Sequence, residues 1–343
     1  MRELKILRDC GYVEDLTFPF YYHYNKEIID RQEAPLGEEL KESYEALMNR
    51  FKPTSDDLYV FFHAIKNERS FFCKYFHHIK SHHFTTDYNF EYVLSLVSDR
   101  TYVIKNLIEF YFYDLPRAEI EKCVNDPVAI MKVIKSSEYT PVEKSKLYEF
   151  FMDPDGAIET LKNELIEMES RLSVYYAEHY EDAVERFLSE KGNAFQEILE
   201  HWNVDEKADG DLYAFVAIVN RGLICIYAPQ GTEILGLGSD YAESWEALKD
   251  QKPVATAEDL GTALGDKSRV KMLDMLLERG EMTCKELELH FHFSASTAYH
   301  HLTTMMRCGV LKSRFCGKLV YYSVNRPYFT EAIKMLEKYA EKE

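Results

Sequence analysis

A group of histidines and one cysteine is the first part of this 343-residue sequence whose side chains could bind a metal ion. The segment from 72 to 83 reads FCKYFHHIKSHH. Cys73 and His77, and likewise His78 and His82, are four residues apart, which is the spacing of zinc ligands on one face of a helix. Adjacent helical residues point about 100° apart, so one ion could not collect the whole group. We expect surface or partly buried imidazoles and no cofactor, and we keep four residues as metal candidates: Cys73, His77, His78 and His82.

A second group of polar side chains follows Ser294 in the string SASTAYHH. Hydroxyl, phenol and imidazole groups near one end of a helix can form hydrogen bonds with the base edges and phosphates of DNA. Whether they do so depends on the elements that hold that helix.

Three helices are predicted around this string. Asp266 precedes an apolar series with three- and four-residue spacing that ends at Gly280, which indicates a scaffold helix. Thr283 and Glu286 form a capping-box pattern that opens a short helix over Cys284–Phe291. Ser294 caps the next helix, which is expected to run to Cys308 and to end at Gly309. A short helix, a tight turn and a second helix make a helix-turn-helix.

Two strand-like runs follow, Val310–Phe315 and Lys318–Val324, separated by Cys316 and Gly317. A two-residue connection favours a tight hairpin, which would be the wing of a winged helix. In that fold the second helix enters the major groove and the hairpin reaches the adjacent backbone. The predicted DNA contacts are Ser294, Ala295, Ser296, Thr297, Tyr299, His300 and His301 on the helix, with Arg314 and Lys318 at the tip of the wing.

The strings ALGDKSR, STAYHHL and GKLVYY resemble the winged-helix repressors of the ArsR family, over about sixty residues. The resemblance implies a homodimeric repressor that binds an operator and releases it when a signal arrives. It also implies that the last helix pairs with its twin across a two-fold axis. The apolar stripe that would do so is Phe329, Ile333, Leu336 and Ala340. Packing of this stripe on the chain's own N-terminal part is the alternative.

The sequence departs from the metal-sensing members of that family, which carry Cys-x-Cys on the first helix of the pair or His and carboxylate ligands on the last helix. Cys284 is the one thiol at the first position, and residues 328–343 contain no His or Cys. A soft-metal site needs three or four ligands, so we expect no metal sensing there. A thiol switch at Cys284, Cys308 or Cys316 is the remaining variant, although buried cysteines commonly act as small hydrophobic residues.

Charge divides unevenly along the chain. From Leu260 onward there are 13 Lys or Arg against 10 Asp or Glu, whereas the first 259 residues hold 28 against 49. Only the C-terminal part can favour DNA electrostatically. The charged start MRELKILRDC has no apolar core of a signal peptide, and seven cysteines without a C-x-x-C pair suggest reduced thiols, so a cytoplasmic protein is expected.

The fold class expected is mainly α with small β elements. Residues 1–250 should form a mostly helical sensor or regulatory domain with a short antiparallel β-meander at about 211–238, followed by a linker at 251–256 and a winged helix-turn-helix DNA-binding and dimerisation domain at 257–343. The segment Leu16–Tyr24, aromatic but containing Pro19, suggests an edge strand or an ordered arm. Gly236-x-Gly238 lacks the further residues of a nucleotide loop and indicates turn chemistry.

The leading hypothesis is a dimeric DNA-binding regulator whose N-terminal domain senses a small molecule. Twelve Tyr and twelve Phe within the first 113 residues could line a pocket, although such density more often forms core. The alternatives are a protein–protein interaction module built on a winged helix that does not bind DNA, and a thiol- or metal-responsive regulator. An enzyme is not expected, since the sequence contains no nucleophile elbow, Walker loop or dinucleotide fingerprint.

Overall fold

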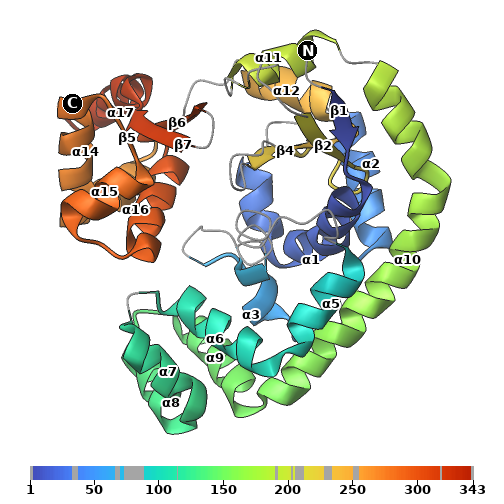
Figure 1. The fold of residues 1–343 in the computed structure, drawn as a ribbon, viewed down its shortest axis with the longest axis horizontal. Coiled ribbons are helices and arrows are strands. Elements are labelled where there is room, and N and C mark those ends of the chain that lie inside the picture. The colour runs from blue at the N-terminus through green and yellow to red at the C-terminus, as the bar shows by residue number, and fades with distance from the viewer. Residues whose placement is uncertain are drawn as a thin grey trace. The chain divides into compact units, whose positions relative to one another are not determined.

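The computed structural model describes residues 3–32, 38–65, 70–72, 89–113, 115–189, 192–201, 204, 212–227, 234–249, 255–316 and 319–340. The chain forms two compact units, one of residues 1–194 with 206–247 and one of residues 195–205 with 248–343. The fold class expected from the sequence, mainly α with small β elements, is confirmed (Figure 1). No helix in the described ranges is long and apolar enough to cross a membrane. The metal candidates Cys73, His77, His78 and His82 lie outside the described residues.

The first unit is built mainly from helices. They are α1 (Arg8–Gln32), α2 (Glu38–Arg50), α3 (Tyr59–Phe62), α5 (Phe90–Ser98), α6 (Arg100–Tyr111), α7 (Arg117–Asn125), α8 (Pro127–Ser136), α9 (Pro141–Met152) and α10 (Pro154–Ser189), while α11 (Asn193–His201) and α12 (Tyr241–Lys249) lie where the two units meet in sequence.

The expectation for Leu16–Tyr24 was wrong, because this segment lies inside helix α1 with Pro19 within it. Proline removes one backbone donor and normally disfavours a helix interior. Burial outweighs that cost here, since Leu16 and Phe20 are fully buried. Gly11 allows the helix to approach the sheet closely, because a Cβ at this position would lie 2.3 Å from the carbonyl oxygen of Val216.

Helix α10 carries the apolar seam that its spacing predicts, and the buried face of this helix organises the unit. Its buried residues include Ile158, Leu161, Leu165, Met168 and Leu172, and the helix packs against α1, α5 and α6 (Figure 1). The seam continues through Tyr176, which is also buried.

The sheet of the first unit is mixed, not the antiparallel meander that the sequence predicts. The three expected strands exist as β2 (Leu212–Ala217), β3 (Ile224–Tyr227) and β4 (Ile234–Gly238), but the order is β1-β2-β4-β3, with β1 (Leu4–Ile6) added from the N-terminus. β1, β2 and β4 run parallel, and β3 pairs antiparallel with β4 alone. β4 is buried throughout and takes an inner position, as continuous apolar strands of parallel sheets do.

Gly236 and Gly238 therefore lie inside strand β4 and not in a turn. A Cβ at Gly236 would lie 2.4 Å from the ring of Phe215, and one at Gly238 would lie 2.0 Å from the carbonyl oxygen of Arg221. The two glycines make room for neighbouring strands and loops, which explains the spacing without a nucleotide.

One buried carboxylate joins three elements of this unit. Asp15 on α1 accepts hydrogen bonds from the hydroxyl of Tyr176 on α10 at 2.6 Å and from the backbone N–H groups of Ile218, Val219 and Asn220, which follow β2, at 2.6–3.0 Å. Its burial raises the pKa of the Asp15 carboxyl to about 7, against the opposing effect of these hydrogen bonds.

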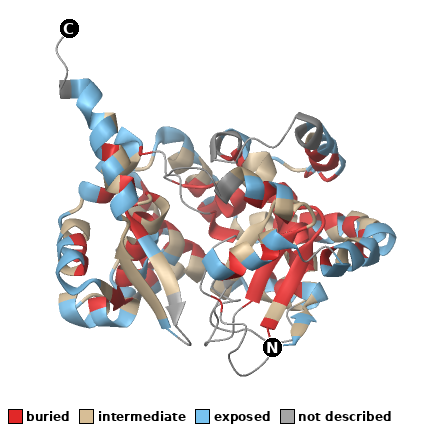
Figure 2. Ribbon diagram, turned by 90° about the horizontal axis from the view of Figure 1, so that it is seen from above, coloured by how far each residue is buried: buried red, intermediate tan, exposed pale blue. Residues whose placement is uncertain are grey.

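The second unit contains helices α13 (Ala257–Leu264), α14 (Lys267–Arg279), α15 (Cys284–Phe291), α16 (Ala295–Arg307) and α17 (Arg326–Ala340), and strands β5 (Glu281–Thr283), β6 (Leu311–Cys316) and β7 (Leu319–Val324). The strands form an antiparallel sheet in the order β5-β7-β6. Leu273, Leu276, Leu287, Leu302 and Met305 belong to one buried core of this unit. Figure 2 colours the buried residues of the chain red.

Candidate nucleic-acid interface

Helices α15 and α16 each begin at a residue whose side chain caps the helix. The Thr283 side chain accepts from the backbone N–H of Glu286, whose carboxylate accepts in return from the Thr283 N–H, so the predicted capping box is confirmed. Ser294 Oγ accepts from the N–H of Thr297 at 3.1 Å, and the two hydroxyls lie 2.7 Å apart. These caps fix where α16 starts and how it leaves the turn.

Helix α16 has one buried and one open face. Ala298, Leu302 and Met305 are fully buried in the core, at the three- and four-residue spacing of a helix. Tyr299 keeps 41% of its surface exposed, and Thr303, one turn further on, is exposed as well. Thr303 is not among the predicted contacts, although its i+4 spacing from Tyr299 places both on the side away from the core.

His300, predicted to read bases, is largely buried, unlike Tyr299. It is 6% exposed and, like Thr304 four residues later, lies along the edge of the buried face. Consecutive helical residues differ by about 100°, and the core covers the side of α16 that carries His300 while Tyr299 stays exposed. His301 is half-buried with its ring centroid 5.4 Å from that of Phe293. The side chains of Ala295 and Ser296 lie outside the described residues.

The predicted wing is present, with a pairing register that differs by one residue. Cys316 pairs with Leu319, so the connection is Gly317-Lys318 and not Cys316-Gly317. Both connecting residues, including the predicted contact Lys318, lie outside the described part of the chain.

Arg314 lies within β6 rather than at the tip of the wing. Its Nε donates to Glu281 Oε2 at 2.7 Å, its Nη2 donates to Oε1 of the same carboxylate, and its guanidinium lies 4.8 Å from the centroid of the Tyr321 ring. The Arg314 guanidinium lowers the pKa of the Glu281 carboxyl.

The predicted apolar stripe of α17 is only partly exposed. Tyr328 and Ala332 are buried, and Phe329 packs partly against the core of the second unit. Ile333 and Leu336 remain 61% and 44% exposed, and Tyr339 beside them is 67% exposed. The side chain of Ala340 is outside the described set. An exposed apolar strip therefore runs along this helix.

The end of α16 is tied to the start of α17 through Gly309. This glycine has φ +77°, and a Cβ there would lie 2.8 Å from the ring of Tyr328. The Asn325 side chain donates to the Gly309 carbonyl at 2.8 Å, and the Asn325 N–H donates to the Val310 carbonyl at 2.9 Å. The recognition-type helix, the base of the wing and α17 therefore meet at one point.

The thiols of this unit are poorly suited to a switch. Burial raises the pKa of both the Cys284 and Cys308 thiols, which disfavours the reactive thiolate. The side chain of Cys316 lies outside the described part of the structure. Among the described residues, no group of three or more His, Cys, Asp or Glu side chains could hold a metal ion.

Comparison with known sequences identifies the family. The sequence model described as "Bacterial regulatory protein, arsR family" matches residues 266–313, from the cap of α14 into β6. Transcriptional repressor SdpR of Bacillus subtilis (strain 168) is 32% identical over 74 residues, which cover 22% of this chain and 81% of that protein. The chain belongs to the arsR family of bacterial regulatory proteins.

Two further relatives from Staphylococcus aureus match in the same way. The cadmium resistance transcriptional regulatory protein CadC homolog is 33% identical over 87 residues, 25% of this chain and 71% of that protein. The arsenical resistance operon repressor is 33% identical over 73 residues, 21% of this chain and 69% of that protein. No family model matches the N-terminal region of this arsR-family chain.

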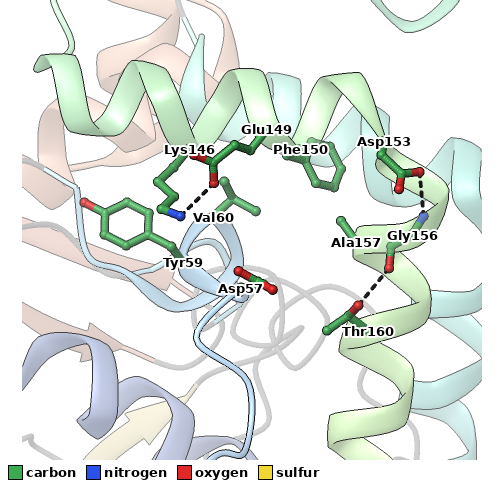
Figure 3. A pocket seen from close by; sticks show the side chains of 10 residues that line it. All are labelled: Asp57, Tyr59, Val60, Lys146, Glu149, Phe150, Asp153, Gly156, Ala157 and Thr160. Atoms are coloured by element: carbon green, nitrogen blue, oxygen red, sulfur yellow. Dashed lines mark hydrogen bonds and ion pairs between the residues drawn. The ribbon is translucent and has the colours of Figure 1, made fainter.

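The first unit contains a hollow of about 230 Å³ between α3, α9 and α10. Figure 3 shows Asp57, Tyr59 and Val60 on one side and Ala157 and Thr160 on the other. Lys146 donates to Glu149 at 2.7 Å, and the N–H of Gly156 donates to Asp153 at 3.0 Å. The complete lining is Asp57, Tyr59, Val60, Lys146, Glu149, Phe150, Asp153, Gly156, Ala157 and Thr160.

Proposed function

We propose that this chain is a DNA-binding transcriptional repressor that acts as a homodimer, with α16 as its recognition helix. The observation that carries the proposal is the open face of α16, where Tyr299 and Thr303 point away from a core that buries the opposite side. A helix held in this way by a preceding helix can enter the major groove with its first turns at the base edges.

The proposed contacts divide by role. Tyr299 and Thr303 read base edges together with the residues of the first turn, while the wing and the helix cap contact phosphates. His300 is only 6% exposed, so we propose that it supports α16 and does not read bases. The proposed DNA-contacting residues are Ser294, Ala295, Ser296, Thr297, Tyr299, His301, Thr303, Arg314 and Lys318.

The proposed dimer forms through α17. Its exposed strip of Ile333, Leu336 and Tyr339 is apolar, and a terminal helix with such a strip gains free energy by burying it. Phe329 and Ala340 complete the predicted dimerisation stripe. A two-fold axis beside α17 would set two α16 helices about one DNA turn, roughly 34 Å, apart.

The relatives support the same direction, because two of the three are named repressors and the third a transcriptional regulatory protein. We propose residues 257–343 as the DNA-binding and dimerisation domain, 251–256 as the linker and 1–250 as the regulatory domain.

Selection of bound duplexes from a random DNA pool by the purified full-length protein tests this proposal. We expect enrichment of a two-fold symmetric site. Lys318→Glu should weaken binding to all duplexes, because it reverses a charge that we propose lies near the DNA backbone. Failure to enrich any sequence, with no retarded band on the DNA upstream of its own gene, would favour the alternative of a protein–protein module.

We further propose that the first unit senses a small molecule, with the α3–α9–α10 hollow as the binding site. The hollow is lined mainly by polar and charged groups, with Val60 and Phe150 as apolar walls, so we propose a polar ligand. Its volume is below the roughly 300–1,000 Å³ of drug-sized pockets, so the ligand should be small.

A thermal-shift screen of metabolites tests the sensor. A compound that stabilises the wild type should lose its effect in Ala157→Phe, which fills the hollow, and should keep it in Val142→Phe, which adds the same ring at an exposed position of α9 that does not line it. The same compound should change DNA affinity. No stabilising compound, with DNA binding unaffected by cell extract, would contradict the sensor.

A further inference from the structure

Asp15 connects parts of the first unit that lie far apart in the sequence. Its carboxylate, on α1, accepts from the Tyr176 hydroxyl on α10 and from three consecutive N–H groups after β2, those of Ile218, Val219 and Asn220, at 2.6–3.0 Å. These partners are 161 to 205 positions away along the chain. We call the five residues the Asp15 latch, because one carboxylate holds together two helices and the end of a strand.

The carboxylate of the latch is buried among uncharged partners. Asp15 is fully buried, and the described groups that donate to it are one hydroxyl and three backbone amides. Such hydrogen bonds offset part of the cost of removing a negative charge from water, but no cation completes the compensation in this set. Burial accordingly raises the pKa of the Asp15 carboxyl to about 7, against the opposing effect of the hydrogen bonds.

The ionisable side chains closest to the latch are neutral or already paired near pH 7. On α10, burial raises the pKa of Tyr175, Tyr176 and Tyr180, so these phenols stay protonated. In the segment after β2, Arg221 pairs with Asp240 at 2.6 Å. Further charged or titratable groups near these tyrosines are Arg8, Asp9 and Tyr12 on α1, Arg50 on α2, and Glu169, His179 and Glu181 on α10.

The two protonation states of Asp15 differ in what they require from their surroundings. The neutral acid can donate its proton across the 2.6 Å contact to the Tyr176 oxygen and still accept from the three N–H groups. The carboxylate keeps all four donors but leaves a charge inside the protein, and access of water would stabilise that charge. The segment 218–220 is the part of the latch that lies outside the helices and strands, so it is the part that can move at least cost.

We propose that Asp15 is a proton-operated latch, which holds segment 218–220 against α1 when protonated and releases it to water when the proton leaves to solvent. The inference concerns the first unit alone and does not depend on DNA binding. It would give the regulatory part of the chain a response to pH close to neutrality.

The linkage between protonation and opening sets the size of the effect. In the open state Asp15 is solvated and its pKa returns to about 4, whereas in the closed state it is about 7. The opening equilibrium constant should therefore rise by up to roughly tenfold per pH unit between these values and level off above pH 7.

Amide hydrogen exchange of the full-length protein between pH 5 and 9 tests the latch. After correction for the intrinsic pH dependence of exchange, the N–H groups of Ile218, Val219 and Asn220 should lose protection by up to roughly tenfold per pH unit up to about pH 7, and no further above it. They should also be at least roughly tenfold less protected than the N–H of Leu165, in the buried middle of α10, because the latch opens without unfolding of the unit.

Variants identify the titrating group. Asp15→Asn should abolish the pH dependence of protection at the three amides. Tyr176→Phe keeps the buried ring but removes a donor that favours the carboxylate, so the levelling-off should move to higher pH. Tyr175→Phe, which removes the neighbouring hydroxyl, is the matched control and should behave as the wild type. So should His179→Asn, which removes the exposed imidazole beside Tyr175.

Protection of the three amides that does not change with pH in the wild type would overturn the latch. So would protection equal to that of Leu165 at every pH, which would assign the change to unfolding of the whole unit. A transition that moves equally in Tyr175→Phe and Tyr176→Phe, or that disappears in His179→Asn, would assign the proton to another group. If Asp15→Asn does not fold, the wild type and Tyr176→Phe still decide the outcome.

Discussion

Arg314 and Glu281 form a bidentate ion pair across β7, since they lie on the two strands that flank it. Both carboxylate oxygens of Glu281 accept from the Arg314 guanidinium. Both residues belong to strands, β6 and β5, so the pair is held on one face of the sheet of the second unit. A DNA phosphate that needs Arg314 must therefore compete with a carboxylate already in place.

Glu281→Gln should strengthen DNA binding roughly two- to fivefold, because it removes the competing charge and releases Arg314 for phosphate. The slope of log affinity against log salt concentration should become steeper by about the amount expected for one additional phosphate contact. Fluorescence anisotropy at two salt concentrations measures both. Glu278→Gln, which makes the same charge change on α14, is the control. Equal effects of the two variants would show that net charge, and not the release of Arg314, causes the change in affinity.

Tyr299→Ala and His300→Ala should fail in different ways. Tyr299 is exposed, so its loss should leave stability within about 0.5 kcal/mol and relax sequence preference at one or two base pairs. His300 is buried, so its loss should cost about 1–3 kcal/mol of stability and leave the selected sequence unchanged. Repeated DNA selection together with urea unfolding separates the two outcomes, and altered preference in His300→Ala would return that residue to the interface.

Ile333→Asp should separate the proposed dimer without unfolding the protomer. The side chain is 61% exposed in the single chain, so a charge there is tolerated in the monomer but would be buried and unpaired in a dimer. Sedimentation should show monomers, and affinity for a two-fold symmetric duplex should fall by more than tenfold. Thr330→Asp, which adds the same charge at another exposed position of α17, should remain dimeric. Dimers of Ile333→Asp would contradict an interface on this strip.

Asp15→Asn should change how the stability of the first unit depends on pH. The raised pKa, about 7 in the fold, means that the folded state holds a proton that the unfolded state has already lost above about pH 4. Wild-type stability should therefore fall as pH rises from about 4 to 7 and level off above it.

The Asp15→Asn variant cannot accept from the Tyr176 hydroxyl and three backbone N–H groups with a single oxygen, so it should be less stable by about 1–3 kcal/mol at pH 5. The gap to wild type should narrow by pH 8, because the variant has no carboxyl to ionise. Urea unfolding at both pH values measures this, and a gap that widens with pH would contradict the assigned direction.

Local signals predicted the second unit well. Ser294, Thr283 and Gly309 act within one turn of their own position, so the helix ends they predict do not depend on distant residues.

Features that depend on distant partners were not predictable in this way. Helix α1 contains Pro19 and β-favouring aromatic residues, and it is helical because α10 and β2, more than a hundred residues away, bury its face. Strand order failed for the same reason, since β4 takes the place beside β2 that a local meander would give to β3. The burial of His300 likewise depends on which face of α16 meets the core, and local spacing did not reveal it.

The close packing of Gly309 against Tyr328 has a mechanical consequence for signalling. Since the Asn325 hydrogen bonds and this ring join the end of α16 to the start of α17, we expect the two helices to move together. In the proposed dimer, a change in the crossing angle of paired α17 helices would then alter the distance between the two α16 helices. Release of DNA would need only a small rotation at the proposed two-fold axis and no unfolding of α16.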